Sequence, residues 1–412
     1  MKVYEGANVR NIALMGHGHA GKTSLVSAML YTAGANTRLG RVDDGTAPTD
    51  YDEEEIARKM SISTSMAYVE WGKTKINLLD TPGFSMFVHE AKMTLPVVDA
   101  AIIVVDGVAG VEVVTLRVWN YCEEYKTPRL LVVNRMDRER ADAARVLESV
   151  EGAFGRTAIP IELPLGKEKS LRGVVDLVRM KAYTYELGGD GKGKETEIPA
   201  DMKDQVQEAH ERLVELVAEG DDKLMEEFFE KGTIPEEHLV TALHEAIRED
   251  KIFPVIFSSG LGNIGADRIL DFIVDYTPAP SEHDWVQGEV ATTPGNGEPP
   301  RRHETDNEPL SLYVFKTVSD PFSGRISYFK VFSGVAKNDA MITNFSRNSQ
   351  EKLAHISIMQ GKTAVPVNEL HAGDIGAVAK LKETLTGDTL GDKSAPIQYP
   401  RVQLPEPAIT FA

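Results

Sequence analysis

An apolar stretch, a glycine-rich loop and a helix-like segment follow one another in residues 10–25, RNIALMGHGHAGKTSL. Residues 11–15 predict a short buried strand, and residues 16–23 match the phosphate-loop pattern G-x-x-x-x-G-K-[ST]. The glycines let the backbone fold closely around a phosphate, and the loop N–H groups with the following helix N-terminus offer partial positive charge. Lys22 would reach the β- and γ-phosphates of a nucleotide, and the Thr23 hydroxyl would bind Mg²⁺. A glycine-rich turn that binds nothing is the alternative, but the strand before and helix after are the context that the motif requires.

Length and composition predict two to four ordinary folded domains. The chain has 412 residues, of which 42% are hydrophobic and 26% charged. Its single cysteine, Cys122, excludes an internal disulfide framework and fits a reducing cytoplasm, where we expect the protein to reside. The first residues lack the apolar core of a signal peptide, and no apolar run approaches the roughly 18 residues of a membrane span. The net charge of −18 argues against indiscriminate polyanion binding. We therefore expect neither DNA nor a membrane as a partner, while a local basic patch or a protein partner stays open.

A second strand predicts the metal side of a nucleotide site. Residues 75–83, KINLLDTPG, read as a strand that ends in Asp80-Thr81-Pro82-Gly83. Asp80 suits the Mg²⁺-side carboxylate of a P-loop nucleotidase, and Gly83 would place a backbone N–H beside the γ-phosphate. The alternative is a strand-end aspartate that starts a turn. The polar stretch 34–65 before this strand is too long for an ordinary connection, and such loops are usually functional or disordered.

Two further strand ends predict the recognition of a base. Residues 100–106 and 130–134 are apolar runs typical of buried parallel strands, and the second ends in Asn134-Arg135-Met136-Asp137. The Asp137 carboxylate could accept hydrogen bonds from both N1–H and the exocyclic amine of guanine, a pair that adenine does not offer. This feature favours GTP over ATP; the alternative is that Asp137 caps a helix at 138–150. A last strand, 253–257, leads into Ser258-Ser259-Gly260-Leu261, whose backbone could close over the guanine.

The spacing of these motifs predicts an inserted subdomain. Positions 137 and 258 are too far apart for a connection within a compact sheet, so residues 157–250 should form an α+β insertion. Within it, residues 188–193 read as a glycine-rich hairpin tip and residues 203–219 as an amphipathic helix. Residues 310–403 contain short β runs separated by turns, which predict a small barrel or sandwich.

The ordered motifs resemble those of translational GTPases. GHGHAGKT, Ser61, DTPG, NRMD and SSGL follow the order of the family's five guanine-nucleotide motifs. The insertion, the DPFSG loop at 320–324 and HAGDIGAVAKLKETLTGDTL at 371–390 resemble bacterial elongation factor G, and the set looks like its diverged second-paralogue branch. The resemblance covers essentially all 412 residues. It implies GTP or GDP and Mg²⁺ as ligands, ribosomal RNA and proteins as partners, and a monomer.

The same resemblance implies the fold and the domain limits. We expect an α/β P-loop GTPase domain, a mostly parallel sheet with helices on both faces, built from residues 1–156 and 251–283. The inserted subdomain spans 157–250, a linker 284–309, and an all-β barrel 310–403. Residues 404–412 look like the start of a third domain. The family carries three further domains, so we expect this chain to be the N-terminal part of a longer protein.

Several positions depart from the family pattern. His19 replaces an aspartate of the phosphate loop, Ser61 replaces the threonine that binds Mg²⁺, and Arg135 replaces the lysine of NKxD. Phe84 occupies the position of the histidine that positions the attacking water, and it can neither accept a hydrogen bond nor carry a proton. Gly18 stands where the family has an apolar gate, so its small size and the bulk of Phe84 could compensate sterically.

We predict three overlapping sets of site residues. The resemblance and the motifs assign catalysis to Lys22, Gly83 and Phe84, the last at the usual histidine position. They assign metal binding to Thr23, Ser61 and Asp80. The guanine nucleotide would contact Gly16, His17, Gly18, His19, Ala20, Gly21, Lys22, Thr23, Ser24, Asp80, Asn134, Arg135, Asp137, Ser259, Gly260 and Leu261.

Three functions fit these residues. The first is a ribosome-associated GTPase, which we favour because the groups for Mg²⁺ and phosphate are retained. The second is a GTP-binding switch or regulatory protein with negligible turnover, motivated by Phe84 and His19. The third is ribosome rescue or antibiotic protection by a related factor with the same two domains.

Overall fold

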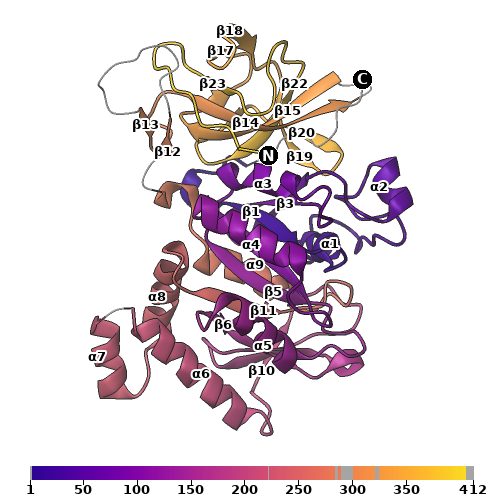
Figure 1. Cartoon of the computed structure of the whole chain (residues 1–412), viewed down its shortest axis with the longest axis vertical. Coiled ribbons are helices and arrows are strands. Elements are labelled where there is room, and N and C mark those ends of the chain that lie inside the picture. Colours follow the sequence, from indigo (N-terminus) through magenta and orange to yellow (C-terminus); the bar gives the residue numbers. More distant parts are fainter. Residues whose placement is uncertain (1, 221, 284–285, 289–299, 321–323, 405–412) are drawn as a thin grey trace.

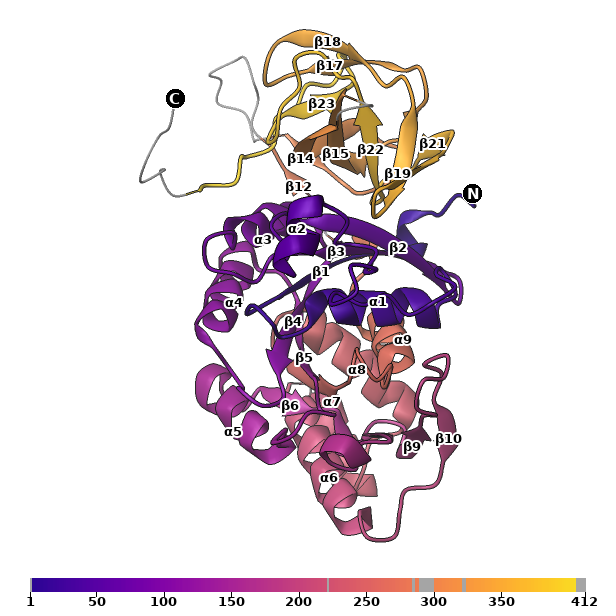
Figure 2. The ribbon, with the colours of Figure 1, turned by 90° about the vertical axis from the view of Figure 1, so that its right-hand side faces the viewer.

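The structure is a computed structural model, and it describes residues 2–220, 222–283, 286–288, 300–320 and 324–404. The expected start of a third domain beyond residue 404, the centre of the DPFSG loop and much of the predicted linker lie outside these residues. Figures 1 and 2 show three layers along the long axis: a β domain (residues 310–403), a nucleotidase-like α/β domain, and the inserted subdomain.

The α/β domain is built on a seven-stranded sheet with strand order β2-β3-β1-β4-β5-β11-β6. Only β2 runs antiparallel to its neighbour; the other pairings are parallel. The central strands β4, β5 and β11 are buried along their whole length, which explains their apolar runs. Because the parallel strands share one direction, their carboxyl ends meet at one edge of the sheet. The strands are β1 (Val9–Gly16), β2 (Ser65–Trp71), β3 (Thr74–Asp80), β4 (Ala100–Asp106), β5 (Arg129–Asn134), β6 (Ala158–Pro160) and β11 (Phe253–Phe257).

Helices cover both faces of this sheet and divide its core into two layers. One face packs against α1 (Lys22–Thr32) and α9 (Ala266–Tyr276), and the other against α3 (His89–Thr94), α4 (Val113–Tyr125) and α5 (Ala143–Phe154). Figure 2 shows the two groups on opposite sides of the strands. The predicted α/β fold with helices on both faces is therefore confirmed. The shorter helices are α2 (Glu53–Arg58) and the 3₁₀ turns η1 (Gly6–Asn8), η2 (Leu95–Val97), η3 (Glu168–Ser170) and η4 (Pro280–Glu282).

The insertion combines a small sheet with three helices. Its antiparallel strands have the order β10-β9-β8-β7, and its helices pack their apolar faces into the core layer that also contains α1 and α9. The strands are β7 (Glu162–Leu165), β8 (Gly173–Asp176), β9 (Lys181–Thr184) and β10 (Lys194–Thr196), and the helices are α6 (Lys203–Ala218), α7 (Asp222–Lys231) and α8 (Glu236–Arg248).

The β domain is an antiparallel eight-stranded sheet of order β18-β17-β23-β14-β15-β22-β19-β20, which agrees with the predicted all-β region. Its strands are β14 (Ser311–Asp320), β15 (Gly324–Ser333), β17 (Met341–Asn344), β18 (Ser349–Lys352), β19 (Ile356–Gln360), β20 (Thr363–Pro366), β22 (Ile375–Ala379) and β23 (Thr389–Gly391). Two minor pairs accompany it: β12 (Val286–Gln287) with β13 (Arg301–Arg302), and β16 (Ala336–Lys337) with β21 (Glu369–Leu370).

Buried ion pairs join the β domain to the α/β domain. Lys75 on β3 donates to both carboxylate oxygens of Asp374, at 2.7 and 2.8 Å. Lys330 lies 3.1 Å from Asp99, which also accepts from His283 at 3.3 Å. Each pair links the β domain, or the segment before it, to the central sheet. The β domain therefore fixes the position of the strands whose ends form the candidate site.

Two expectations about local structure need correction. The helix predicted at 138–150 is α5 and begins at Ala143, where Asp142 caps it by accepting from Arg145 N. Asp137 is therefore not a helix cap, and that alternative was wrong. The strand β6 lies just inside the region expected to be the insertion, yet it pairs with β11 in the main sheet. Among the described residues, no helix is both long and apolar enough to span a bilayer.

Candidate nucleotide-binding site

The glycine-rich loop between β1 and α1 has the tight geometry that its sequence predicts. Gly16 and Gly21 have φ of 137° and 88°, values that favour glycine. A Cβ built on Gly16 would lie 2.3 Å from Val104 O, and one on Gly21 would lie 2.5 Å from Asn134 Nδ2. Because α1 begins directly after Gly21, its N-terminal N–H groups face the concave side of the loop, as in an anion-binding site.

Lys22 is the cation of this loop. Its Nζ donates to Gly16 O at 3.1 Å and to His17 O at 3.0 Å, so the ammonium group is held inside the loop by backbone carbonyls. Burial lowers the pKa of Lys22 to about 8, against the opposing charges of Asp80 and Asp50. The side chain therefore still carries its charge at neutral pH, in a place where a phosphate would meet it.

Hydroxyl and carboxylate groups gather at the start of α1. Thr23 Oγ1 lies 3.2 Å from Ser61 Oγ, and Ser61 donates to Asp50 Oδ1 at 2.8 Å. Thr49 donates to one oxygen of Asp80 at 2.7 Å. The other Asp80 oxygen is buried and has no hydrogen-bond partner among the described residues. The structure thus brings together the three predicted metal ligands, Thr23, Ser61 and Asp80.

The two carboxylates of this cluster lie in an environment that disfavours their charge. Burial, with the nearby Asp80, raises the pKa of Asp50 to about 6. Burial likewise raises the pKa of Asp80, although Thr49 and Lys22 act in the opposite direction. Two buried acids beside three hydroxyls form an all-oxygen donor set that suits a hard divalent cation such as Mg²⁺. No group of three or more His, Cys, Asp or Glu placed for metal binding occurs in the described part of the chain.

Asn134 ties the phosphate loop to the loop after β11. Its Nδ2 donates to Ala20 O at 3.0 Å and to Gly21 O at 3.2 Å. Its Oδ1 accepts from Gly260 N at 2.9 Å and from Ser258 Oγ at 3.2 Å. The predicted base-recognition residue is thus fully engaged by the protein and orients two loops at once.

Asp137 contacts the loop after β11, and Arg135 contacts the phosphate loop. Asp137 Oδ1 accepts from Ser259 Oγ at 2.7 Å, which orients the carboxylate from the loop after β11. Arg135 Nη1 donates to Asp106 Oδ2 and to His19 O, both at 2.5 Å. The Arg135 stem lies 3.6 Å from a Cβ built on Gly21, so it runs over the phosphate loop. Arg135 therefore joins the loop to the end of β4.

Phe84 packs into the space that Gly18 leaves free. A Cβ built on Gly18 would lie 3.2 Å from the Phe84 ring, and the His19 ring meets Phe84 edge-on at 5.1 Å between centroids. The Phe84 ring packs directly against Gly18, the contact that the expected steric compensation requires. Gly83 beside it admits no side chain, since its Cβ would lie 2.2 Å from Lys22 Nζ. The backbone at Gly83 therefore approaches the Lys22 ammonium directly.

One open cleft collects most of the predicted residues. Thirteen of them line it: Gly18, His19, Gly21, Lys22, Thr23, Ser24, Ser61, Gly83, Phe84, Asn134, Arg135, Asp137 and Leu261. The other six, Gly16, His17, Ala20, Asp80, Ser259 and Gly260, belong to the surrounding strand ends and loops without lining the cleft.

Sequence reasoning missed three residues of the site. Thr49 and Asp50 lie in the long polar stretch, which carries no periodic signal, and only the fold brings them to Asp80 and Ser61. Asp106 was open to detection, because it ends the apolar run 100–106 just as Asp80 ends its own strand. The carboxyl ends of the parallel strands lie at one edge of the sheet, and there Asp106 at the end of β4 accepts a hydrogen bond from Arg135, which follows the neighbouring strand β5.

Comparisons with known proteins agree with this geometry. Residues 7–279 match the family described as elongation factor Tu GTP binding domain, and residues 309–393 match elongation factor G domain 2. A crystal structure of a protein from Thermus thermophilus is 31% identical in sequence and superimposes with a TM-score of 0.84. The match covers 98% of this chain and 57% of that one, so the chain spans little more than half the length of this relative.

Proposed function

The chain belongs to the family of the elongation factor Tu GTP-binding domain, and we propose that it is an elongation-factor-G-like factor that hydrolyses GTP on the ribosome. The observation that carries the proposal is the convergence of three elements at one sheet edge. They are the glycine-rich loop with Lys22, the hydroxyl–carboxylate cluster around Asp80, and the tie from Asn134 to the loop beside Asp137. The departures at His19, Ser61, Phe84 and Arg135 support an assignment to the diverged second-paralogue branch.

Binding of the nucleotide follows from the chemistry of the two ends of the cleft. The loop N–H groups and Lys22 would hold the phosphates, as a charged group and a helix N-terminus do for anions. The Asp137 carboxylate, oriented by Ser259, would accept two hydrogen bonds from guanine. Arg135 would form one wall with its aliphatic stem, while its guanidinium stays on Asp106.

The cluster at the start of α1 fits Mg²⁺. Thr23, Ser61 and Asp80 would hold the ion, and Asp50 would orient Ser61 from its hydrogen bond of 2.8 Å. One oxygen of Asp80 is buried without a hydrogen-bond partner, so a bound cation would offset the free-energy cost of burying its charge. When bound, Mg²⁺ supplies positive charge to the β- and γ-phosphates.

Hydrolysis requires attack of water on the γ-phosphorus and cleavage of its bond to the β-phosphate oxygen, giving GDP and phosphate. Lys22 would stabilise charge that develops on the phosphate oxygens, and the Gly83 N–H, on the backbone that approaches the Lys22 ammonium, would be a second donor. Phe84 cannot orient or deprotonate the water. Orienting the water falls to the backbone or to a group from outside the chain, for which ribosomal RNA is our proposal, and the proton of the water ends on the released phosphate.

A GTP-binding switch with negligible turnover is the second candidate, and the packing of Phe84 between Gly18 and His19 favours it. Steady-state phosphate release from GTP separates the two functions. The natural chain and Phe84→His are compared, each with and without 70S ribosomes. Turnover by the natural chain at or above that of Phe84→His supports a GTPase that places water by another group. Absence of turnover that histidine restores supports the switch, and absence of GTP binding in both proteins refutes either function.

A further inference from the structure

The glycine-rich tip of the insertion, residues 188–193, touches the loop after β11. Gly191 has φ of 77°, and a Cβ built on it would lie 2.1 Å from Thr32 Oγ1 and 2.3 Å from Asn263 Nδ2. Thr32 donates to Asn263 Oδ1 at 3.1 Å, and Asn263 Nδ2 donates to Gly189 O at 3.3 Å. Only a glycine at 191 allows the tip to approach both the last residue of α1 and Asn263.

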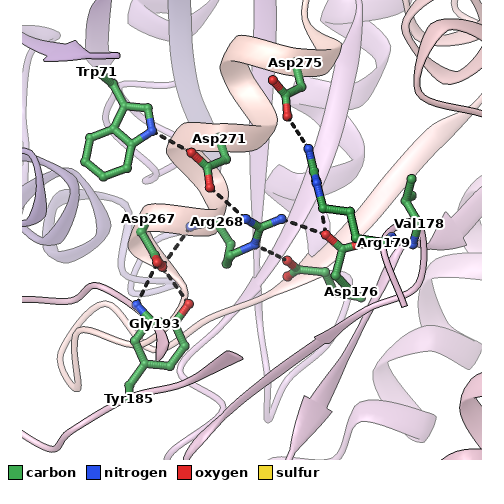
Figure 3. A network of polar contacts seen from close by, with 11 residues as sticks. Trp71, Asp176, Val178, Arg179, Tyr185, Gly193, Asp267, Arg268, Asp271 and Asp275 are labelled. Carbon is green, nitrogen blue, oxygen red and sulfur yellow. Dashed lines mark hydrogen bonds and ion pairs between the residues drawn. The ribbon is translucent and has the colours of Figure 1, made fainter. Parts of the chain in front are cut away.

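A buried carboxylate fixes both ends of this tip. Asp267, in the first turn of α9, accepts from Tyr185 Oη at 2.6 Å and from Gly193 N at 2.8 Å, as Figure 3 shows. The neighbouring Arg268 is also buried and donates to Asp176 at 2.7 Å. One acidic side chain thus holds Tyr185, just before the tip, and Gly193, its last residue, against the helix that follows the loop.

The loop that the tip contacts is the one that orients Asp137. Ser259 and Ile264 exchange two backbone hydrogen bonds of 3.0 Å, which close residues 259–264 into one compact unit containing Asn263. Ser259 Oγ in the same unit donates to Asp137 at 2.7 Å. Contacts therefore run without a break from Gly191 through Asn263 and Ser259 to the candidate base-recognition carboxylate.

We propose that the insertion tip is a latch that holds the loop 259–264 closed over the base and so slows release of guanine nucleotide. The inference rests on the proposed function and goes beyond it by giving the insertion a role in nucleotide retention. Gly191 and Asn263 are positioning residues, because they act on the base through Ser259 and Asp137. Thr32 couples the same latch to α1, whose other end begins at the phosphate loop.

The chain provides a matched pair of variants for the test. Gly188 and Gly191 lie in the same tip with φ of 74° and 77°, but a Cβ on Gly188 would meet nothing within 4 Å. Gly188→Ala and Gly191→Ala therefore carry the same backbone strain, and only Gly191→Ala pushes against Asn263 and Thr32. In the full chain, release of N-methylanthraniloyl-GDP is measured by stopped-flow displacement with excess GDP. We expect Gly191→Ala to release it about five- to tenfold faster than Gly188→Ala, the effect of losing a net hydrogen bond or slightly more.

A second variant tests the same contact from the other side. Asn263→Asp removes the amide donor to Gly189 O but keeps an acceptor for Thr32 and tolerates the φ of 53°. It should also accelerate nucleotide release. In the double variant with Gly191→Ala, the fold increase in release rate should be smaller than the product of the two single increases, because both substitutions break the same contact. Equal release rates for Gly188→Ala and Gly191→Ala would overturn the latch. A change of the same size in the association and release rates of Gly191→Ala would also overturn it.

An independent readout separates this inference from the proposed function. Hydrogen–deuterium exchange in the nucleotide-free chain reports on amides 259–264 without any ligand. Faster exchange there in Gly191→Ala than in Gly188→Ala supports the closing of the loop by the tip, and unchanged exchange refutes it. If the natural chain binds no N-methylanthraniloyl-GDP, the proposed function fails, and the role of the tip in nucleotide retention fails with it. The exchange data still decide whether the tip orders the loop 259–264.

Discussion

Replacement of Asn134 by alanine should destabilise the protein even when no nucleotide is bound. The side chain is fully buried and makes four hydrogen bonds, two donated to the phosphate loop and two accepted from the loop after β11. In a site where asparagine contacts only the nucleotide, the same substitution would leave the free protein unchanged. The geometry here assigns Asn134 a structural task that precedes ligand binding.

The expected magnitude follows from the bond count. A net contribution of about 1 kcal/mol for each hydrogen bond gives about 4 kcal/mol for four, and partial relaxation of the loops reduces this to about 3 kcal/mol. Ser258→Ala removes one of the same four bonds, at 3.2 Å, and should cost about 1 kcal/mol. The ratio between the two variants therefore tests the reasoning more sharply than either value alone.

Urea unfolding of the nucleotide-free chain provides the assay. Trp71 on β2 and Trp119 on α4 report by fluorescence on the domain that contains Asn134. The midpoint for Asn134→Ala should fall well below that for Ser258→Ala at an unchanged slope. A loss below about 1 kcal/mol for Asn134→Ala, or one no larger than that for Ser258→Ala, would refute the role of Asn134 as a tie between the loops.

Two further predictions concern specificity and pH. Asp137→Asn should weaken the binding of guanine nucleotides by about 100-fold, because two charge-assisted hydrogen bonds to the base are lost, and it should admit xanthosine nucleotides. Equilibrium titration with labelled GDP and XDP checks this, and unchanged GDP affinity would contradict the guanine assignment. His283 contributes stability at low pH: burial lowers its pKa, but the hydrogen bond to Asp99 and the charge of Glu304 outweigh burial and raise its pKa above the ordinary 6.5. That stability is full below about pH 6.5 and is lost as pH rises through the raised pKa of His283. The urea midpoint of the natural chain should therefore fall between about pH 6 and 8, and His283→Gln should flatten this fall. An equally steep fall in the variant would exclude His283 as its source.

Motif spacing and apolar runs predicted the frame of the site because both are local. The strands β4 and β11 have the predicted bounds, since a parallel strand buried on both faces needs an uninterrupted apolar run. The phosphate loop was equally accessible, because its pattern lies within eight consecutive residues, although the close contacts of its glycines come from Val104, Phe84 and Asn134. The helix after Asp137 was misplaced because Asp137 and Asp142 are both plausible caps, and only the tertiary contact of Asp137 with Ser259 distinguishes them.

Contacts between distant segments were not accessible in this way. Asp50 reaches Ser61 and Thr49 reaches Asp80 only because the polar stretch 34–65 folds back over the start of α1. The contact of Gly191 with Asn263 joins positions 72 residues apart, and it depends on how the insertion docks on α9. Such pairings have no sequence period, so they emerge only from the folded chain.

Four of the five departures from the expected family pattern, at Gly18, His19, Phe84 and Arg135, form one connected set in space, whereas the fifth, Ser61, contacts Thr23 and Asp50. Phe84 fills the room beside Gly18, the His19 ring meets the Phe84 ring edge-on, and the His19 carbonyl accepts from Arg135. A lysine at 135 would be a single point charge and could not reproduce the planar guanidinium that donates to Asp106 and the loop together. Because each of these four residues contacts another of the four, the set is consistent with adjustment of the phosphate loop to one packing arrangement. The bulk at position 84 therefore belongs to the packing of the site, and the proposed GTPase function requires that a group outside this set supply the hydrogen bond that Phe84 cannot make.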